Sequence, residues 1–146
     1  DEMNKAIKEA LKKKFDIVIM AAAASDYVVK NATSSKIKSD KKEINVKLVK
    51  APKIIDVIKN KQKEIFLVGF KAETDISKNE LVSRAKKKLK DSKADKIVAN
   101  DIGRNYNKDP NYNEIIIVDS KSTTKIPRTK KERLSKIICK NIEKRI

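Results

Sequence analysis

The feature that most constrains the fold of this chain is a set of three short, unbroken apolar runs. They cover Ile17 to Met20, Ile65 to Gly69 and Ile97 to Ala99. Parallel strands that are covered on both faces show continuous runs of this kind. Segments with helical periodicity lie before, between and after the runs. This succession predicts an α/β fold of three layers, with helices around a mostly parallel sheet.

Other segments have the apolar spacing of helices or of further strands. The expected helices are 1–14, a short helix opened by Pro52, 79–90 and 130–144. The alternation from Glu43 to Lys50 places Ile44, Val46 and Leu48 on one side, which predicts a half-exposed strand with one covered face. The segments 114–118 and 123–128 read as a hairpin. We expect this hairpin to form a small antiparallel appendage.

The charge balance brings nucleic acid into consideration as a partner. The chain has 37 basic and 20 acidic residues, a net charge of +17, so a basic nucleic-acid-binding module is one hypothesis. Only five of the basic residues are arginine, the commonest reader of guanine edges, and the lysines are spread along the chain. This pattern favours a lysine-biased composition and a phosphate-bearing ligand over sequence-specific binding of nucleic acid.

Composition also excludes several kinds of site. The chain has no histidine and one cysteine, which excludes an internal disulfide, a Cys/His zinc site and a histidine base. Cys139 lies in a helical apolar pattern and is predicted to be a core residue. No apolar run approaches the roughly 18 residues needed to cross a bilayer. With 146 residues, we expect one cytoplasmic domain with no membrane partner.

Polar and small residues gather where the three predicted strands end. These stretches are Ala22 to Tyr27, Gly69 to Thr74, and Ala99 to Asp101. Ends of parallel strands share one edge of a sheet, and ligands of α/β proteins bind beyond that edge. A helix opened by Pro52 would present free N–H groups to an anion there. The glycine fingerprint of dinucleotide-binding folds and the P-loop motif are both missing, which disfavours an oxidoreductase domain, the competing enzyme class.

Five blocks in this order carry a resemblance to a known family. They are AAAASDY, then KIK ten residues after the aspartate, Ala-Pro before a helix, VGFKAET, and DKIVAND after Ala85-x-x-Lys88-Leu89. Their order and spacing resemble the phosphopantothenoylcysteine synthetase (phosphopantothenate–cysteine ligase) family of coenzyme A biosynthesis. The resemblance covers roughly residues 1 to 146 and implies a Rossmann-like fold.

The resemblance also implies an activity, cofactors and partners. In this family the carboxylate of 4′-phosphopantothenate attacks CTP, with Mg²⁺ present, and the amine of cysteine then displaces CMP from the acyl-cytidylate. The complete enzyme would be a homodimer. It is often fused to a flavin-dependent decarboxylase, so FMN is expected only if such a domain exists outside this chain. Some relatives accept ATP in place of CTP.

Site residues are carried over by position. Lys36 matches the lysine that helps to form the acyl-cytidylate and belongs to a lid, and no residue is assigned as a metal ligand. The nucleotide-binding set is Asp26, Lys36, Pro52, Lys53, Ile54, Ile55, Phe70 and Lys88. The substrate-binding set is Ala22 and Ala23, with Asn100 and Asp101 added from their place at a strand end.

Each of these residues also has a purely structural interpretation. Asp26 could cap a turn, Phe70 could belong to the core, and Lys36 and Lys88 could be solvated lysines. Asn100 and Asp101 could satisfy backbone groups at the end of a strand.

The chain departs from the family pattern in three places. The family usually has aspartate where Lys53 stands and a second nucleotide-binding lysine where Ser92 stands. The strand, glycine-rich turn and Asn-x-Ser-Ser-Gly segment with which the family opens are not in this sequence. We therefore expect residues 1–146 to be the carboxy-terminal portion of the ligase domain, with an amino-terminal segment lying before them. Alone, they should not catalyse the ligation.

Overall fold

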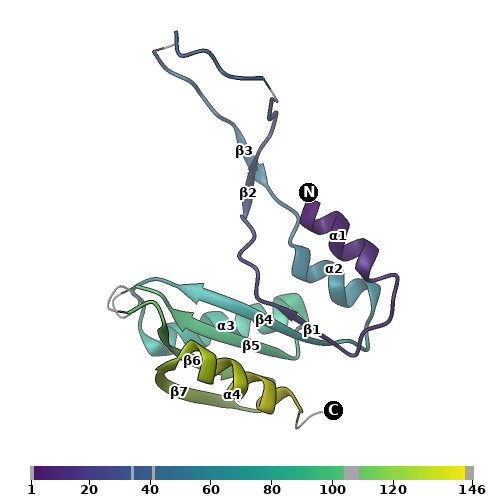
Figure 1. Cartoon of the computed structure of the whole chain (residues 1–146), viewed down its shortest axis with the longest axis vertical. Helices are drawn as coiled ribbons and strands as arrows, with labels where there is room; N and C mark the ends of the chain where they lie inside the picture. The colour runs from purple at the N-terminus through teal and green to yellow at the C-terminus, as the bar shows by residue number, and fades with distance from the viewer. Residues whose placement is uncertain (1, 34, 41, 104–108, 144–146) are drawn as a thin grey trace.

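A five-stranded sheet forms the centre of the computed structural model, which describes residues 2–33, 35–40, 42–103 and 109–143 (Figure 1). Its strands are β1 (Ile17–Met20), β4 (Phe66–Glu73), β5 (Lys96–Asp101), β6 (Tyr112–Val118) and β7 (Thr123–Lys130), in the order β1-β4-β5-β6-β7. The first three strands are parallel, and β6 and β7 continue the sheet in antiparallel fashion. The predicted hairpin therefore exists, and it extends the main sheet.

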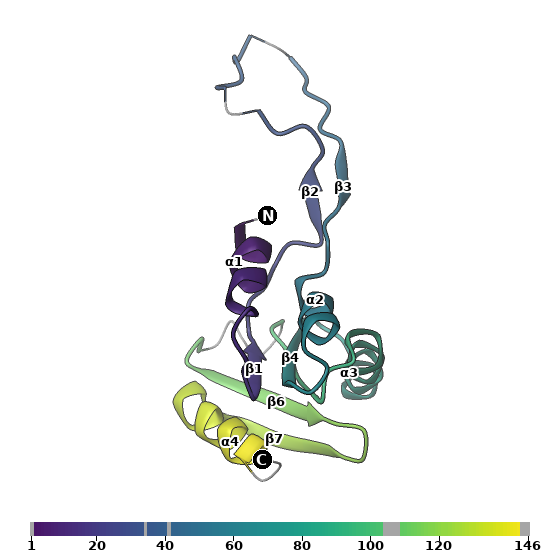
Figure 2. The same cartoon turned by 90° about the vertical axis from the view of Figure 1, so that its right-hand side faces the viewer.

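Helices cover both faces of this sheet, so the predicted three layers are present. The helices are α1 (Glu2–Ala10), α2 (Ile54–Lys61), α3 (Lys78–Ser92) and α4 (Lys131–Glu143). Successive residues of a strand point to opposite faces. Leu67 accordingly packs in the cluster that holds α1, α2 and α3, whereas Val68 packs in the cluster that holds α4. Figure 2 shows α2 and α3 on one side of the sheet and α4 on the other.

A second, two-stranded sheet projects from this body. It pairs β2 (Tyr27–Val29) with β3 (Leu48–Lys50) in antiparallel register, and residues 30–33, 35–40 and 42–47 lie beyond it (Figure 1). We call residues 27–50 the arm. The α/β class, with parallel strands and an additional small antiparallel sheet, is thus confirmed.

The prediction that Glu43 to Lys50 has one covered face is wrong. Only Leu48–Lys50 is a strand, and Ile44, Val46 and Leu48 are 49%, 56% and 56% exposed. Alternation of apolar residues indicates that a face is suited to burial, but in the described part of the chain no element packs on this face.

One strand boundary and one predicted core residue also differ from expectation. Strand β4 continues to Glu73 because it pairs with β5 up to Asp101. Cys139 is exposed, so the prediction of a core cysteine is wrong. The buried side of α4 runs through Leu134, Ile138 and Ile142, and Cys139 lies about 100° around the helix from Ile138. The predicted end of that helix, Lys144, lies outside the described residues.

Gly69 allows α2 to pack closely on the sheet. A Cβ atom at this position would lie 2.8 Å from Ile55 Cδ1 and 2.9 Å from Ile97 Cδ1. Contacts of this length are sterically forbidden, so the absence of a side chain brings α2 against β4. The amino terminus of α2 is thereby held near the edge where β1 and β4 end.

Within the described residues, no helix combines the length and apolar character that a membrane crossing requires.

Candidate functional site

A cavity of about 530 Å³ opens at the carboxyl ends of β1 and β4. Its walls come from the segment after β1, the segment that leads into α2, the second half of β4 and one side of α3. The lining residues are Met20 to Asp26, Ala51 to Ile55, Phe70 to Ala72, Arg84, Lys87, Lys88, Asp91 and Asn100. This is the edge of an α/β sheet where ligands generally bind.

The structure brings ten of the twelve predicted site residues into this cavity. They are Ala22, Ala23, Asp26, Pro52, Lys53, Ile54, Ile55, Phe70, Lys88 and Asn100. The three strand ends, about forty residues apart in sequence, therefore converge as parallel pairing requires. Lys36 and Asp101 do not line the cavity.

Cations dominate the charged lining of the cavity. Five basic residues face two carboxylates, Asp26 and Asp91. Two of the cations, Lys71 and Arg84, are paired with Glu73 at 2.9 Å and 2.8 Å. Although partial burial acts to raise the pKa of Glu73, hydrogen bonds from Lys71 and Arg84 hold it below its usual value. These two cations are thus fixed at the wall with most of their charge balanced.

The other three cations, Lys53, Lys87 and Lys88, differ from these two. Among the described residues, none of the three has a carboxylate within ion-pair distance. Burial lowers the pKa of the Lys88 ammonium, and repulsion from Lys53 lowers it further, while attraction from Asp56 and Asp26 acts in the opposite direction. Lys88 is partly buried, whereas Lys53 and Lys87 are exposed. A partly buried ammonium group with a like charge nearby favours a bound anion, because the anion supplies countercharge.

Asp26 also lines the cavity, where its charge acts on Lys88. The turn here is held by Ser25, whose Oγ donates to the Tyr27 carbonyl at 2.7 Å and accepts from the Tyr27 N–H at 3.4 Å. Asp26 contributes its backbone carbonyl, which accepts from the Ala51 N–H at 2.9 Å. No hydrogen bond to the Asp26 side chain is formed within the described parts of the chain. The geometry thus leaves this carboxylate free for a ligand, and the turn does not depend on it.

Phe70 packs against the core and also lines the cavity. Its side chain is partly buried against the cluster that contains Leu134 and Ile142. A ligand that reaches it would therefore meet an aromatic ring supported by the core.

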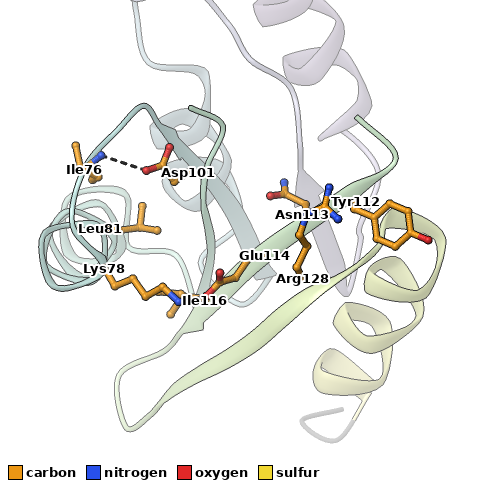
Figure 3. Close-up of a pocket in the computed structure, with 9 residues that line it drawn as sticks. All are labelled: Ile76, Lys78, Leu81, Asp101, Tyr112, Asn113, Glu114, Ile116 and Arg128. Atoms are coloured by element: carbon orange, nitrogen blue, oxygen red, sulfur yellow. Dashed lines mark hydrogen bonds and ion pairs between the residues drawn. The ribbon is translucent and has the colours of Figure 1, made fainter. Parts of the chain in front are cut away.

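Asp101 has a structural role. Its carboxylate accepts hydrogen bonds from the backbone N–H groups of Asp75 at 3.0 Å, Ile76 at 3.1 Å and Gly103 at 2.7 Å. Asp101 lines a separate cavity of about 210 Å³. Figure 3 shows the residues around it, which come from α3, β6 and β7 among others, with Lys78 pointing toward Glu114. Asp101 thus joins the ends of β4 and β5, as its alternative interpretation described.

Lys36 belongs to the arm, is exposed, and is not among the residues that line the cavity. Ten residues separate it from Asp26, and an extended chain of that length spans up to about 35 Å. In the conformation described, Lys36 does not reach the cavity of its own chain.

Sequence reasoning missed four charged residues of the lining: Lys71, Arg84, Lys87 and Asp91. One signal was available for three of them. Arg84, Lys87, Lys88 and Asp91 follow the spacing i, i+3, i+4, i+7 and so share one face of a helix. Once Lys88 was assigned to the site, its neighbours on that face followed from helical geometry.

No group of three or more Cys, Asp or Glu side chains suited to hold a metal ion occurs within residues 2–33, 35–40, 42–103 and 109–143.

Fold and cavity together define a Rossmann-like α/β domain with a cavity, lined mainly by cations among its charged residues, at the carboxyl edge of its sheet. All 146 residues match the family described as the DNA/pantothenate metabolism flavoprotein C-terminal domain. The chain belongs to this family, and the family predicted from its five sequence blocks is thereby confirmed.

Relatives of known sequence agree with this assignment. The chain is 41% identical over 145 residues to the coenzyme A biosynthesis bifunctional protein CoaBC of Thermococcus kodakarensis, covering 99% of this chain and 35% of that protein. It is 35% identical over 136 residues to the protein of the same name from Methanocaldococcus jannaschii, covering 93% and 32%. The chain thus spans about a third of the length of these relatives.

Solved structures share the fold. The DNA/pantothenate metabolism flavoprotein from Streptococcus pneumoniae superposes with a TM-score of 0.80 at 25% identity, over 97% of this chain and 68% of that chain. A Cab2 mutant, H337A, in complex with phosphopantothenate-cysteine has a TM-score of 0.58 at 18% identity, over 87% and 44%. At 18% identity the likeness concerns the fold.

Proposed function

We propose that this chain is the nucleotide-binding portion of a ligase that joins 4′-phosphopantothenate to L-cysteine in coenzyme A biosynthesis. The reaction would pass through an acyl-cytidylate formed with CTP. The observation that carries the proposal is a cavity at the carboxyl edge of the sheet that is lined by three ammonium groups with no ion pair among the described residues, those of Lys53, Lys87 and Lys88. Membership of the family supports it.

The lining suits a reaction between two polyanions. A carboxylate that attacks a nucleotide phosphate must approach against electrostatic repulsion, and fixed cations reduce that repulsion and stabilise charge that builds up in the transition state. The small side chains of Ala22 and Ala23 let a substrate lie close to the backbone after β1. Holding the activated acyl group beside the cysteine amine would supply much of the remaining rate enhancement.

Mg²⁺ would enter this site with the nucleotide. In proteins it commonly keeps several waters and binds through substrate phosphates and one or two carboxylates. Asp26 and Asp91 are the two carboxylates of the lining, so they are the residues that would hold it. The ion would neutralise part of the charge on the phosphates.

Binding of CTP is the first test of this proposal. In calorimetry at about 0.2 M salt, we expect the chain to bind CTP, while NAD and a DNA duplex give no comparable response. Lys88→Met should weaken CTP binding about tenfold, because it removes a charge-assisted hydrogen bond. Lys86→Met is the matched control, since Lys86 is exposed on α3 and does not line the cavity. Sequence-selective binding of the duplex without any response to CTP would refute the ligase proposal.

The arm suggests how the chain associates with a second copy. It exposes several large apolar side chains, namely Tyr27, Val28, Val29, Ile37, Ile44, Val46 and Leu48. In the described residues β2 and β3 pair only with each other, so each has an unpaired edge. Edges of this kind pair readily with another strand. We propose that two arms pair and cover their apolar side chains in a homodimer.

The names of the relatives describe bifunctional proteins. We therefore propose a flavin-dependent decarboxylase, with its FMN, as a fused or associated partner.

A charge on the arm should disrupt the homodimer proposed to form through the arms. We expect the double variant Val28→Lys/Val46→Lys to shift the chain from dimer to monomer in sedimentation equilibrium, because a buried unpaired ammonium is strongly unfavourable. Phe15→Lys is the control, since Phe15 is an exposed apolar residue outside the arm. A mass unchanged by the double substitution would exclude the arm as the interface.

A further inference from the structure

Lys53 occupies an unusual position at the wall of the cavity. It is the N-cap residue of α2, with φ −73° and ψ 109°, and no side chain caps the helix there. N-cap positions favour Ser, Thr, Asp and Asn, whose side-chain oxygen accepts a hydrogen bond from a backbone N–H of the first turn. Helix α3 shows the usual arrangement, in which Ser77 Oγ accepts from the Glu80 N–H at 3.1 Å. A lysine has no acceptor, so α2 begins without this stabilisation.

Lys53 also adds positive charge where positive charge is already concentrated. Lys71, Lys87 and Lys88 line the same cavity, and repulsion between Lys53 and Lys88 contributes to the lowered pKa of Lys88. The folded chain thus carries two costs at one residue, a missing cap and a like-charge contact. A serine at this position would remove both.

We propose that Lys53 is a specificity-determining residue that binds the polyphosphate of the nucleotide, so that this site selects a nucleoside triphosphate over a monophosphate. The inference rests on the proposed function, which makes the ligand a nucleotide. A phosphate group accepts hydrogen bonds from ammonium groups. Asp56 and Asp26 attract Lys88, but among the described residues neither Lys53 nor Lys88 forms an ion pair, so a polyphosphate would supply the direct contacts that both ammonium groups lack. A monophosphate has too little charge to serve Lys53, Lys87 and Lys88 together. The ligand therefore offsets the stability that Lys53 costs the free chain.

The test is a substitution that should change stability and binding in opposite directions. For Lys53→Ser we expect the Tm without ligand to rise by about 3 °C, since serine caps α2 and the repulsion is gone. Affinity for CTP and for inorganic tripolyphosphate should fall about tenfold. Affinity for CMP should change less than twofold. Calorimetry and thermal unfolding of the 146-residue chain measure all four quantities.

Two further variants make the comparison specific. Lys61→Ser has the same change of side chain at the other end of α2, where the lysine is exposed and does not line the cavity. It should leave the affinity for CTP and tripolyphosphate unchanged. Lys53→Arg keeps the charge. It should bind CTP and tripolyphosphate as the wild type does, and its Tm should stay at the wild-type value, below that of Lys53→Ser.

The outcomes separate this inference from the proposed function. If the wild-type chain binds CTP and Lys53→Ser binds it equally well, or loses CTP and CMP to the same extent, the role of Lys53 is refuted and the ligase proposal stands. If the chain binds tripolyphosphate through Lys53 but does not bind CTP, the nucleotide proposal fails and the phosphate site remains. A lower Tm in Lys53→Ser than in wild type would refute the claim that Lys53 destabilises the free chain while it strengthens polyphosphate binding.

Discussion

Replacing Lys36 with methionine should reduce formation of the acyl-cytidylate by at least about a hundredfold, the typical effect of removing one group that stabilises transition-state charge. The expected readout is release of pyrophosphate from CTP with phosphopantothenate present and cysteine absent, in a form of the protein that carries out the ligation. Lys36 is exposed on the arm, so the substitution should leave the Tm unchanged. Methionine keeps most of the length of the side chain and removes only its charge.

The control for this prediction is Lys47→Met. Lys47 is an exposed lysine of the same arm, and its backbone carbonyl accepts from the Lys30 N–H at 2.9 Å, an interaction that the substitution preserves. Unaltered pyrophosphate release by Lys36→Met, or equal losses in the two variants, would remove Lys36 from the mechanism.

The same variant identifies the cavity that Lys36 serves. Lys36 lies away from the cavity of its own chain, so either the arm folds back or the lysine enters the cavity of a second copy. Mixing Lys36→Met with Asp26→Asn distinguishes the two. Random mixing of two variants makes half of the dimers mixed. If the lysine acts across the dimer, each mixed dimer has one intact site, with Asp26 from one chain and Lys36 from the other, so about a quarter of the activity returns. If it acts within its own chain, mixing restores none.

Asp119→Asn should lower the free energy of unfolding by about 3–5 kcal/mol, because it leaves a buried ammonium without its partner. Lys96 Nζ lies 2.9 Å from Asp119 Oδ2, and the two side chains are only 6% and 10% exposed. The other carboxylate oxygen accepts from the N–H groups of Lys121 at 2.8 Å and Ser122 at 2.7 Å. Asp119 therefore joins the start of β5 to the turn between β6 and β7. Urea unfolding of wild type and Asp119→Asn at pH 7 measures the loss in free energy of unfolding.

The pH dependence of this effect has a defined sign. Burial alone would raise the pKa of Asp119, but hydrogen bonds from Lys96 and from the turn hold it far below its usual range. A carboxylate with a lowered pKa stabilises the folded state above the pKa of the unfolded chain, about 3.9. This stabilisation is lost as the pH falls toward the folded-state value. The difference in the free energy of unfolding between wild type and Asp119→Asn should therefore be largest at pH 7 and should decrease below about pH 4.

Two further variants separate the pair from general effects of charge. Lys96→Met combined with Asp119→Asn should recover part of the loss, since no buried ammonium then remains unpaired. Glu132→Gln breaks an exposed pair with Lys136 at 3.3 Å and should cost less than about 1 kcal/mol. A loss from Asp119→Asn as small as that from Glu132→Gln would contradict the role assigned to the buried pair.

Local patterns explain why the strand ends could be predicted. A run such as Ile97 to Ala99 must be covered on both faces wherever it lies, and parallel pairing then places its end beside those of the other two strands. This rule predicted that Asp26, Phe70 and Asn100 lie at one edge of the sheet, and all three line the same cavity. The roles of Asp26 and Lys88 toward a nucleotide came from family resemblance, and they remain predictions.

The arm could not be predicted in the same way. Ile44, Val46 and Leu48 alternate as a covered strand does, yet they are exposed, because alternation does not say which partner covers a face. The prediction that Cys139 is buried was wrong for a related reason. Apolar residues cover a broad part of the helix surface around it, and only the packing of α4 on the sheet decides which side is buried.

The sequence by itself determined most of the succession of helices and strands, the edge at which the cavity forms and the family, since these depend on periodicity and on short motifs. Strand β2 was not predicted, and the hairpin expected as an appendage extends the main sheet. Only the tertiary structure decided which cations of that site are paired, that Asp101 holds backbone groups together, and that Lys36 stands on a projecting arm. These properties depend on distances between residues far apart in the chain. Such distances are set when α2, α3 and the sheet pack against one another, and no local pattern contains them.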